Sequence, residues 1–371
     1  MTAFTNIWRT VLAAKVMLAL VVLSVVLGAA FNADQFRSAY ARWPAGEDPE
    51  LASRFSTWDI AHYLRLSQGG YEAGSHSCAF YPLWPAALRV ATVLTSGRPV
   101  LASILLTNAL SIVALWLFYR LVEGRYGEAM GRDALIMLLA FPGALFLSFA
   151  YTESFYLVIL LGLFRSLEKE RYFWACVTAF LLPLARPVGV FILLPLAWHL
   201  YERRRNIKHW PMLAVPLLGY ACYFGVIYLW TGNAFEGFEA QKSYPNSPSI
   251  KNMFNVAGFT AAFANVGTLD GMMDSVLDRG FFLLVLALLP LVYRLDKTWF
   301  WYTLPAGVVP ALTSWFMSYR RYVMVLFPIF IVLTQLAAKS KSRWLFWYYI
   351  AFMAALQAWA IKQFVNFNWA G

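Results

Sequence analysis

A short polar stretch, STWDIAHYLRLSQGG, occupies residues 56–70 of an otherwise largely apolar chain. Within it, Asp59, His62 and Tyr63 are spaced i, i+3 and i+4, so a helix would place all three on one face. A carboxylate beside hydrogen-bonding side chains suits the removal of a proton from a hydroxyl group. We therefore expect Asp59 to be the general base of a candidate site that includes His62 and Tyr63.

The same stretch also fits an ordinary capped helix. Ser56 and Asp59 match a capping box, and Gly69 or Gly70 would end the helix. Trp58 is of the aromatic type that anchors proteins at a membrane interface. The local pattern therefore leaves Asp59 as a base, a helix cap, or both.

Further charged residues lie beside apolar runs. Glu153 occurs in FAYTESFY, Arg186 in LLPLARPVGV, and Arg320 and Arg321 precede Tyr322 in SYRRYVMVLFP. An ionisable group at membrane depth is a functional hypothesis by default, and a guanidinium group matches the oxygens of a phosphate. These positions are candidates for binding a charged substrate.

Each of these positions has a structural alternative. Glu153 could begin a helix together with Thr152, where the helix dipole favours a carboxylate. Arg186 could extend to lipid headgroups, and the Arg320–Arg321 pair could contact anionic lipid in general. The sequence pattern alone leaves both readings open.

The segment 231–252 combines aromatic residues with the amide of Gln241 and the amine of Lys242. This mixture suits sugar recognition, although it is common in loops at a membrane interface. The three cysteines form no CxxC motif or Cys/His cluster, and the histidines lack metal-ligand spacing. We expect neither a metal site nor a disulfide framework.

The composition predicts an all-α polytopic membrane protein. Hydrophobic residues make up 61% of the 371 residues and charged residues 13%, compared with about 25% charged in soluble domains. Apolar stretches of roughly 17–25 residues recur, and they lack the alternation of a membrane β-barrel. The net charge of +11 arises largely from short basic loops, which indicates contact with membrane lipids rather than nucleic acid.

The chain is expected to form one domain, 1–371, with about 11 spans. The predicted spans are 11–31, 98–121, 133–150, 152–167, 172–185, 187–203, 210–230, 280–294, 298–317, 320–338 and 343–363.

The distribution of basic residues predicts an orientation. Placing the short basic loops in the cytoplasm puts the N-terminus inside and two large loops, 32–97 and 231–279, outside. The apolar segment 79–97 must then lie along the outer surface, because a crossing there would reverse every later basic loop. Pro85 near its start and Gly97 at its end are consistent with a surface helix.

Several motifs together resemble a known family. In order, they are WDIAHYLRLSQGGY, AFYPLWP, SFAYTESFY, LARPVGV, GFEAQKSY and SYRRYVMVLFP, from about residue 58 to 328. This series resembles the GPI mannosyltransferase II (PIG-V-like) family and its bacterial relatives, within the GT-C glycosyltransferases. The first two motifs are the most specific. The chain departs from the family where Pro187 and Val188 follow the arginine, in place of the usual polar residue.

The resemblance implies a GT-C-type helix bundle with surface helices in the first outer loop and an active site on the extracytoplasmic face. It also implies transfer of a sugar, usually mannose, from a polyprenyl-phosphate sugar to a hydroxyl of a lipid-linked or glycan acceptor. One base and a single displacement would invert the configuration of the sugar. Asp59 would be the base, and the lipid phosphate would be held by Arg186, Arg320 or Arg321 with Tyr322. The other expected substrate-binding residues are Trp58, His62, Tyr63, Glu153, Gln241 and Lys242.

Two other classes of function fit the same composition. A transporter or flippase of lipid-linked sugars would also have many helices and buried charges, but it predicts inverted repeats, and none is apparent. A glycan-binding membrane protein would keep the same helix bundle but would have no catalytic activity. Release of polyprenyl phosphate from polyprenyl-phosphate mannose would separate the enzyme from both.

Overall fold

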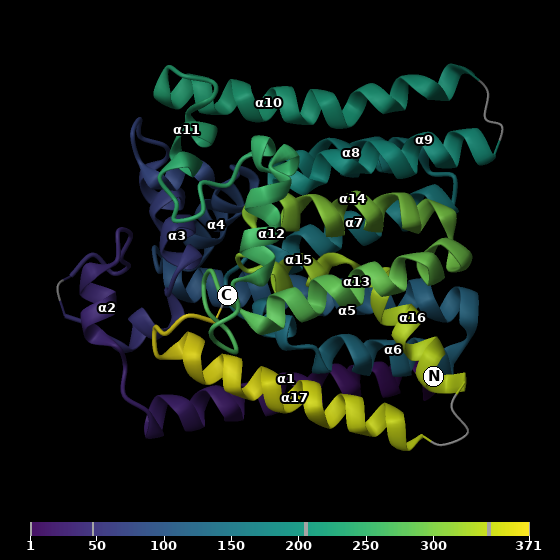
Figure 1. Ribbon diagram of the computed structural model, residues 1–371, viewed down its shortest axis with the longest axis horizontal. Helices are drawn as coiled ribbons and strands as arrows, with labels where there is room; N and C mark the ends of the chain where they lie inside the picture. Colours follow the sequence, from purple (N-terminus) through teal and green to yellow (C-terminus); the bar gives the residue numbers. More distant parts are fainter. Residues whose placement is uncertain (1, 47, 204–206, 340–342, 371) are drawn as a thin grey trace.

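The computed structural model describes residues 2–46, 48–203, 207–339 and 343–370, with side chains from residue 7 onward. Across these ranges the regular elements are helices, apart from one isolated bridge between Thr268 and Ser275. The long helices lie side by side and form a bundle (Figure 1). Their bounds are α1 (Thr2–Gly28), α5 (Pro99–Tyr126), α6 (Glu128–Ala140), α7 (Glu153–Glu168), α8 (Tyr172–Ala185), α9 (Leu193–Glu202), α10 (Ala214–Thr231), α13 (Val276–Leu295), α14 (Lys297–Ser314), α16 (Phe327–Lys339) and α17 (Trp344–Val365).

The helices have the apolar character expected of membrane spans. Five segments in the described part of the chain are long and apolar enough to cross a bilayer: Ile7–Gly28, Pro99–Tyr126, Ile207–Thr231, Val276–Leu295 and Trp344–Val365. A sixth would be the pair α15 (Tyr319–Val325) and α16, which is bent by 78°. The all-α, polytopic class is confirmed, whereas the count of 11 spans stays a prediction.

Several predicted spans are interrupted, which is why fewer helices reach full length. The predicted span 133–150 is α6 followed by the 3₁₀ helix η3 (Pro142–Leu147), and 187–203 begins with η4 (Pro187–Ile192) before α9. A proline stands at the start of each 3₁₀ helix, where its missing N–H does least harm. The predicted span 210–230 begins with η5 (Ile207–Leu213) before α10, and 320–338 is divided by the bend between α15 and α16.

Lys15 attaches α1 to the segment that ends near the site. The lysine lies within the helix, and the residue is half-buried. It donates to Asn108 Oδ1 at 3.1 Å, to the carbonyl of Leu147 at 3.1 Å and to Ser148 Oγ at 2.6 Å. These bonds satisfy a cation that would be costly to bury alone.

A cluster of ion pairs lies at one end of the bundle. Arg125, near the end of α5, donates to Glu168 Oε1 and Asp296 Oδ2, both at 2.6 Å. These contacts join the ends of α5 and α7 to the α13–α14 connection. In Figure 1, α1 begins at this same end of the bundle, whereas α17 ends toward the other.

The two large loops gather at the opposite end. The loop 32–97 contains α2 (Ala33–Ser38), η1 (Leu51–Phe55), α3 (Asp59–Gly69), η2 (His76–Ala79) and α4 (Leu83–Leu94), and the loop 231–279 contains α11 (Glu236–Lys242), η6 (Ile250–Phe254) and α12 (Val256–Ala264). The helix α4 has 12 residues and is therefore about 18 Å long, too short to cross a hydrocarbon core of about 30 Å. Its length favours the predicted surface helix.

Candidate functional site

Asp59 is the first residue of α3, and the helix begins differently from the predicted capping box. Trp58 is the N-cap and has a positive φ of 53°, and no side chain caps the helix. The capping-box prediction is wrong because the Ser56 hydroxyl bonds to the carbonyl of Trp43 instead. The predicted end is confirmed, since Gly70 follows the helix with a φ of 76° and donates to the carbonyl of Leu66. The carboxylate of Asp59 is therefore available for a distant partner.

That partner is Arg321, which belongs to a chain of four alternating charges. Its Nη1 pairs with Asp59 Oδ2, and its Nε donates to Glu153 Oε1 at 2.9 Å. The same Glu153 oxygen accepts a second bond, 2.9 Å long, from Nη1 of Arg186. The fold thus joins residues from α3, α7, the α8–η4 junction and α15 into one ionic network.

The network is open at one end only. The side chain of Asp59 is 27% exposed and that of Arg321 is 12% exposed, whereas Arg186 is 7% and Glu153 is 0% exposed. Asp59 Oδ1 has no hydrogen bond to any residue that the structure describes, so one carboxylate oxygen is free to accept a proton. Glu153 is fully enclosed and instead positions the two arginines.

Aromatic rings surround both guanidinium groups. The Arg321 guanidinium lies 4.3 Å from the ring centroid of Tyr151, and that of Arg186 lies 5.3 Å from the ring of Tyr322. Cations are attracted to ring faces, most strongly where water is excluded. Burial raises the pKa of the Tyr151 phenol above its ordinary value, so this ring stays neutral beside Arg321.

Asp59 and Arg321, the two charged residues nearest the opening, both follow residues with strained backbone. Trp58 immediately precedes Asp59, and the turn before Arg321 contains Trp315, Phe316 and Ser318 with φ values of 47°, 75° and 56°. Residues other than glycine rarely adopt such φ values, and they persist only where the contacts of the surrounding structure hold them. Strain of this kind clusters at ligand sites, which supports a functional role for both turns.

Arg320 helps to hold the turn and does not join the network. Its completely buried guanidinium pairs with Asp270, and its backbone N–H donates to Asp278 Oδ1 at 3.0 Å. Burial raises the pKa of Asp270, an effect that Arg320 opposes. The two arginines that the sequence could not distinguish therefore point to different surroundings.

Arg186 is positioned by the break between α8 and η4. It has an extended backbone, with φ of −154°, and connects the two helices. Gly189 packs so tightly against α8 that a Cβ atom there would clash with the carbonyl of Leu182. Pro187, at which the chain departs from the family pattern, is the first residue of η4, and Val188 beside it is buried.

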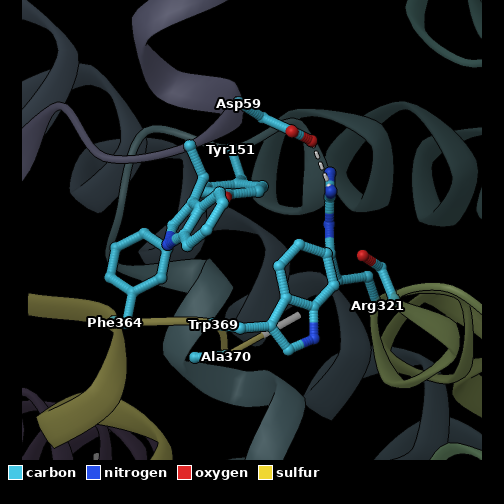
Figure 2. A pocket seen from close by; sticks show the side chains of 8 residues that line it. Asp59, Tyr151, Arg321, Phe364, Trp369 and Ala370 are labelled. Atoms are coloured by element: carbon cyan, nitrogen blue, oxygen red, sulfur yellow. Dashed lines mark hydrogen bonds and ion pairs between the residues drawn. The ribbon is translucent and has the colours of Figure 1, made fainter. Parts of the chain in front are cut away.

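A pocket lies where Asp59 and Arg321 meet (Figure 2). Its free space is about 10 Å³, room for roughly one water molecule, so a sugar can enter only when the surrounding side chains move apart. The residues that line it are Trp58, Asp59, Tyr151, Ser318, Arg321, Phe364, Trp369 and Ala370.

His62 and Tyr63 pack behind the pocket rather than lining it. His62 Nδ1 lies 2.9 Å from Ser77 Oγ, and its ring stacks on Phe80 with centroids 4.6 Å apart. Burial lowers the pKa of His62 to about 4, outweighing the nearby charge of Asp59. Tyr63 is buried in the core beneath α3, and burial raises the pKa of its phenol. The expected contact of these two residues with substrate stays a prediction.

Gln241 and Lys242 lie on α11, which packs against η2. Neither lines the pocket, and the amine of Lys242 pairs with Glu239. Within the described ranges, no group of three or more His, Cys, Asp and Glu side chains could hold a metal ion. The role of Gln241 and Lys242 in sugar binding is likewise a prediction.

The sequence pattern missed the part of the site contributed by α17 and the residues after it. Phe364, Trp369 and Ala370 line the pocket, although 300 or more positions separate them from Asp59 in the sequence. The segment FVNFNWA carries no charge and no recognisable motif. Tyr151 could have been found, because it stands two positions before Glu153 within FAYTESFY.

Comparison with known proteins agrees with the resemblance seen in the sequence. Residues 48–207 match the family model of mannosyltransferase (PIG-V), a range that includes Asp59, Glu153 and Arg186 but is less than half of the chain. Together with the apolar helices, this match supports a membrane glycosyltransferase. No curated protein matches the sequence.

Among solved structures, the chain is similar to an oligosaccharyltransferase from Archaeoglobus fulgidus, crystallised with zinc and sulfate. The TM-score is 0.47 with 10% sequence identity, over 96% of this chain and 53% of the other. The chain thus spans about half the length of that protein.

Proposed function

We propose that this protein is a membrane mannosyltransferase that uses a polyprenyl-phosphate sugar as donor and a hydroxyl of a lipid-linked or glycan molecule as acceptor. The observation that carries the proposal is the placement of Asp59 and Arg321 in one pocket. A base and a phosphate-binding cation are the two groups that such a transfer requires. The match of residues 48–207 to the mannosyltransferase model supports mannose as the sugar.

In the proposed reaction, the acceptor hydroxyl oxygen attacks the anomeric carbon of the sugar. The bond between that carbon and the phosphate oxygen breaks, and its electron pair leaves with polyprenyl phosphate. The hydroxyl proton passes to Asp59, whose Oδ1 is free to accept it. A single displacement through an oxocarbenium-like state inverts the configuration of the sugar.

Arg321 is proposed to stabilise the negative charge that develops on the phosphate. Its guanidinium already bridges two carboxylates, and a phosphate can replace Asp59 as one partner. That exchange would release the Asp59 carboxylate for proton transfer when the donor binds. Glu153 keeps Arg321 and Arg186 in place during the exchange.

The proposed site faces the extracytoplasmic side. It lies at the end of the bundle that holds the two large loops, opposite the ion-paired loops around Arg125 (Figure 1). Short loops rich in basic residues remain on the cytoplasmic side. A lipid-linked donor would then reach the pocket from the outer leaflet, past the surface helix α4.

Purified protein in detergent or lipid nanodiscs should release polyprenyl phosphate from polyprenyl-phosphate mannose when an extract of glycolipid acceptors is present. The matched control is the Asp59→Asn variant, which should bind the donor without releasing the product. Donor binding with no release under any acceptor condition would favour a transporter or a binding protein instead.

A further inference from the structure

The residues that follow α17 fold back over the start of α3. The backbone N–H of Asn32 donates to the carbonyl of Asn366 at 2.8 Å, and Arg54 Nη1 donates to Asn366 Oδ1 at 2.5 Å. The indole N–H of Trp58 donates to the carbonyl of Asn368 at 3.1 Å. This segment is therefore fixed against the first large loop and forms one wall of the pocket.

Two indole rings meet at a right angle beside Asp59. The rings of Trp58 and Trp369 have centroids 5.2 Å apart and an angle of 85° between their planes. Phe367 stacks on Trp58 in a nearly parallel orientation, 5.0 Å away, and so covers one of its faces. Figure 2 shows Trp369 in the pocket with Asp59 and Arg321, drawn below Asp59 and next to the Arg321 side chain.

The indole nitrogen of Trp369 differs from that of Trp58 in its hydrogen bonding. The Nε1 atom of Trp58 has the carbonyl of Asn368 as its acceptor, whereas Nε1 of Trp369 is buried and has no acceptor among the residues that the structure describes. A buried indole N–H usually finds a partner. The N–H of Trp369 is therefore an unused donor on a residue that lines the pocket.

We propose that Trp369 contacts the transferred sugar of the donor. The inference rests on the proposed function and assigns one part of its substrate. The indole ring packs against the C–H face of the pyranose, and its N–H donates to a sugar hydroxyl once the pocket widens around the ligand. Arg321 holds the phosphate, Trp369 holds the sugar, and Asp59 lies where the acceptor hydroxyl must arrive.

The test compares two probes, polyprenyl-phosphate mannose and polyprenyl phosphate without the sugar. Trp369→Ala should weaken binding of the mannose-bearing probe about 10-fold or more and leave binding of the sugar-free probe unchanged. Trp369→Phe keeps an aromatic ring, although a smaller one, and removes the N–H, so the loss should be roughly 2- to 10-fold. Because the contact is made before and during the reaction, KM for the donor should rise and kcat should stay within about twofold.

Trp347→Ala is the matched control, since that tryptophan is 51% exposed near the other end of α17. It should leave both affinities unchanged. Equal affinities of wild type and both Trp369 variants for the mannose-bearing probe, with wild-type activity intact, would overturn this inference alone. Loss of affinity for both probes at an unchanged melting temperature would overturn it too, because Trp369 would then contact the lipid phosphate. A wild-type protein that neither binds the donor nor releases polyprenyl phosphate would overturn the proposed function as well.

Discussion

Asp59 and Arg321 are separated by 262 positions in the sequence and form an ion pair in the folded protein. The first belongs to the loop between α1 and α5, and the second follows the sharp turn after α14. A helix bundle brings such positions together only if the helices between them return the chain to the same end. The ion pair therefore requires that the loop before α5 and the turn after α14 lie at the same end of the bundle.

Asp59→Asn separates a base from a structural carboxylate. Asparagine can accept a hydrogen bond from Arg321 but cannot usefully accept a proton, so turnover should fall roughly 10²- to 10⁴-fold. Transfer rate, donor affinity and melting temperature should be measured together. Asp34→Asn is the control in the same large loop, where the side chain is 98% exposed, and it should have wild-type turnover. Activity of Asp59→Asn within a few-fold of wild type would exclude the base.

The two adjacent arginines should respond differently to replacement by lysine. Lysine keeps the charge but loses the planar fork that binds a phosphate through two donors. Arg321→Lys should therefore weaken donor binding, by about 10-fold if one charge-assisted bond is lost. Arg320→Lys should leave donor affinity unchanged and lower the melting temperature, because its partner is the buried Asp270. Identical donor affinities for both variants would contradict the assignment of the phosphate site to Arg321.

The sequence allowed the elements of this site to be predicted better than their contacts. The helix carrying Asp59 and the charged positions at Glu153, Arg186 and Arg321 follow from their types and their place beside apolar runs. Their pairing into one network does not, because it depends on how the helices pack over long separations in the chain. Arg320 and Arg321 are the clearest case, since one residue of helical rotation sends the two guanidinium groups to different partners.

The fold shows the same division. Apolar length predicted where the helices lie, and Pro328 marks the break between α15 and α16, but neither the 78° angle of the bend nor the position of the segment after α17 follows from a local pattern. Trp369 reaches the pocket because the segment around it binds Asn32, Arg54 and Trp58. Such contacts across the whole chain cannot be derived from periodicity or motif spacing.

Glu153→Gln should destabilise the protein strongly. The neutral amide would leave Arg186 and Arg321 without their shared buried carboxylate, and breaking such a pair costs about 3–5 kcal/mol of folding free energy. The double variant Glu153→Gln/Arg186→Gln should be less destabilised than the sum of the two single variants. Thermal unfolding of the four proteins in one detergent measures this coupling, and strict additivity would show that the two side chains do not interact.

Stability should fall as the pH drops below about 6.5, in part because of His62. Burial lowers the pKa of the folded-state imidazole to about 4 from its ordinary 6.5, so between these values the unfolded state binds more protons. The contribution of His62 is constant above pH 6.5 and is lost progressively down to about pH 4. His62→Gln should therefore reduce the decrease in melting temperature between pH 7 and pH 4.5. Parallel curves for the two proteins would show that His62 is not titrating in this range.

Cysteine labelling can test which end of the bundle faces the cytoplasm. Ser96 follows α4, the predicted surface helix, and Gly124 lies near the far end of α5; both are exposed. The 28 residues of α5 span about 42 Å, so the two positions lie on opposite sides of a bilayer if α5 crosses it. In cells, an impermeant thiol reagent should label Ser96→Cys and should not label Gly124→Cys until the membrane is opened. The background should have Cys78, Cys176 and Cys222 replaced by serine or alanine, and each cysteine variant should keep its transfer activity. Labelling of Gly124→Cys alone from outside would reverse the orientation and place the pocket with Asp59 on the cytoplasmic side.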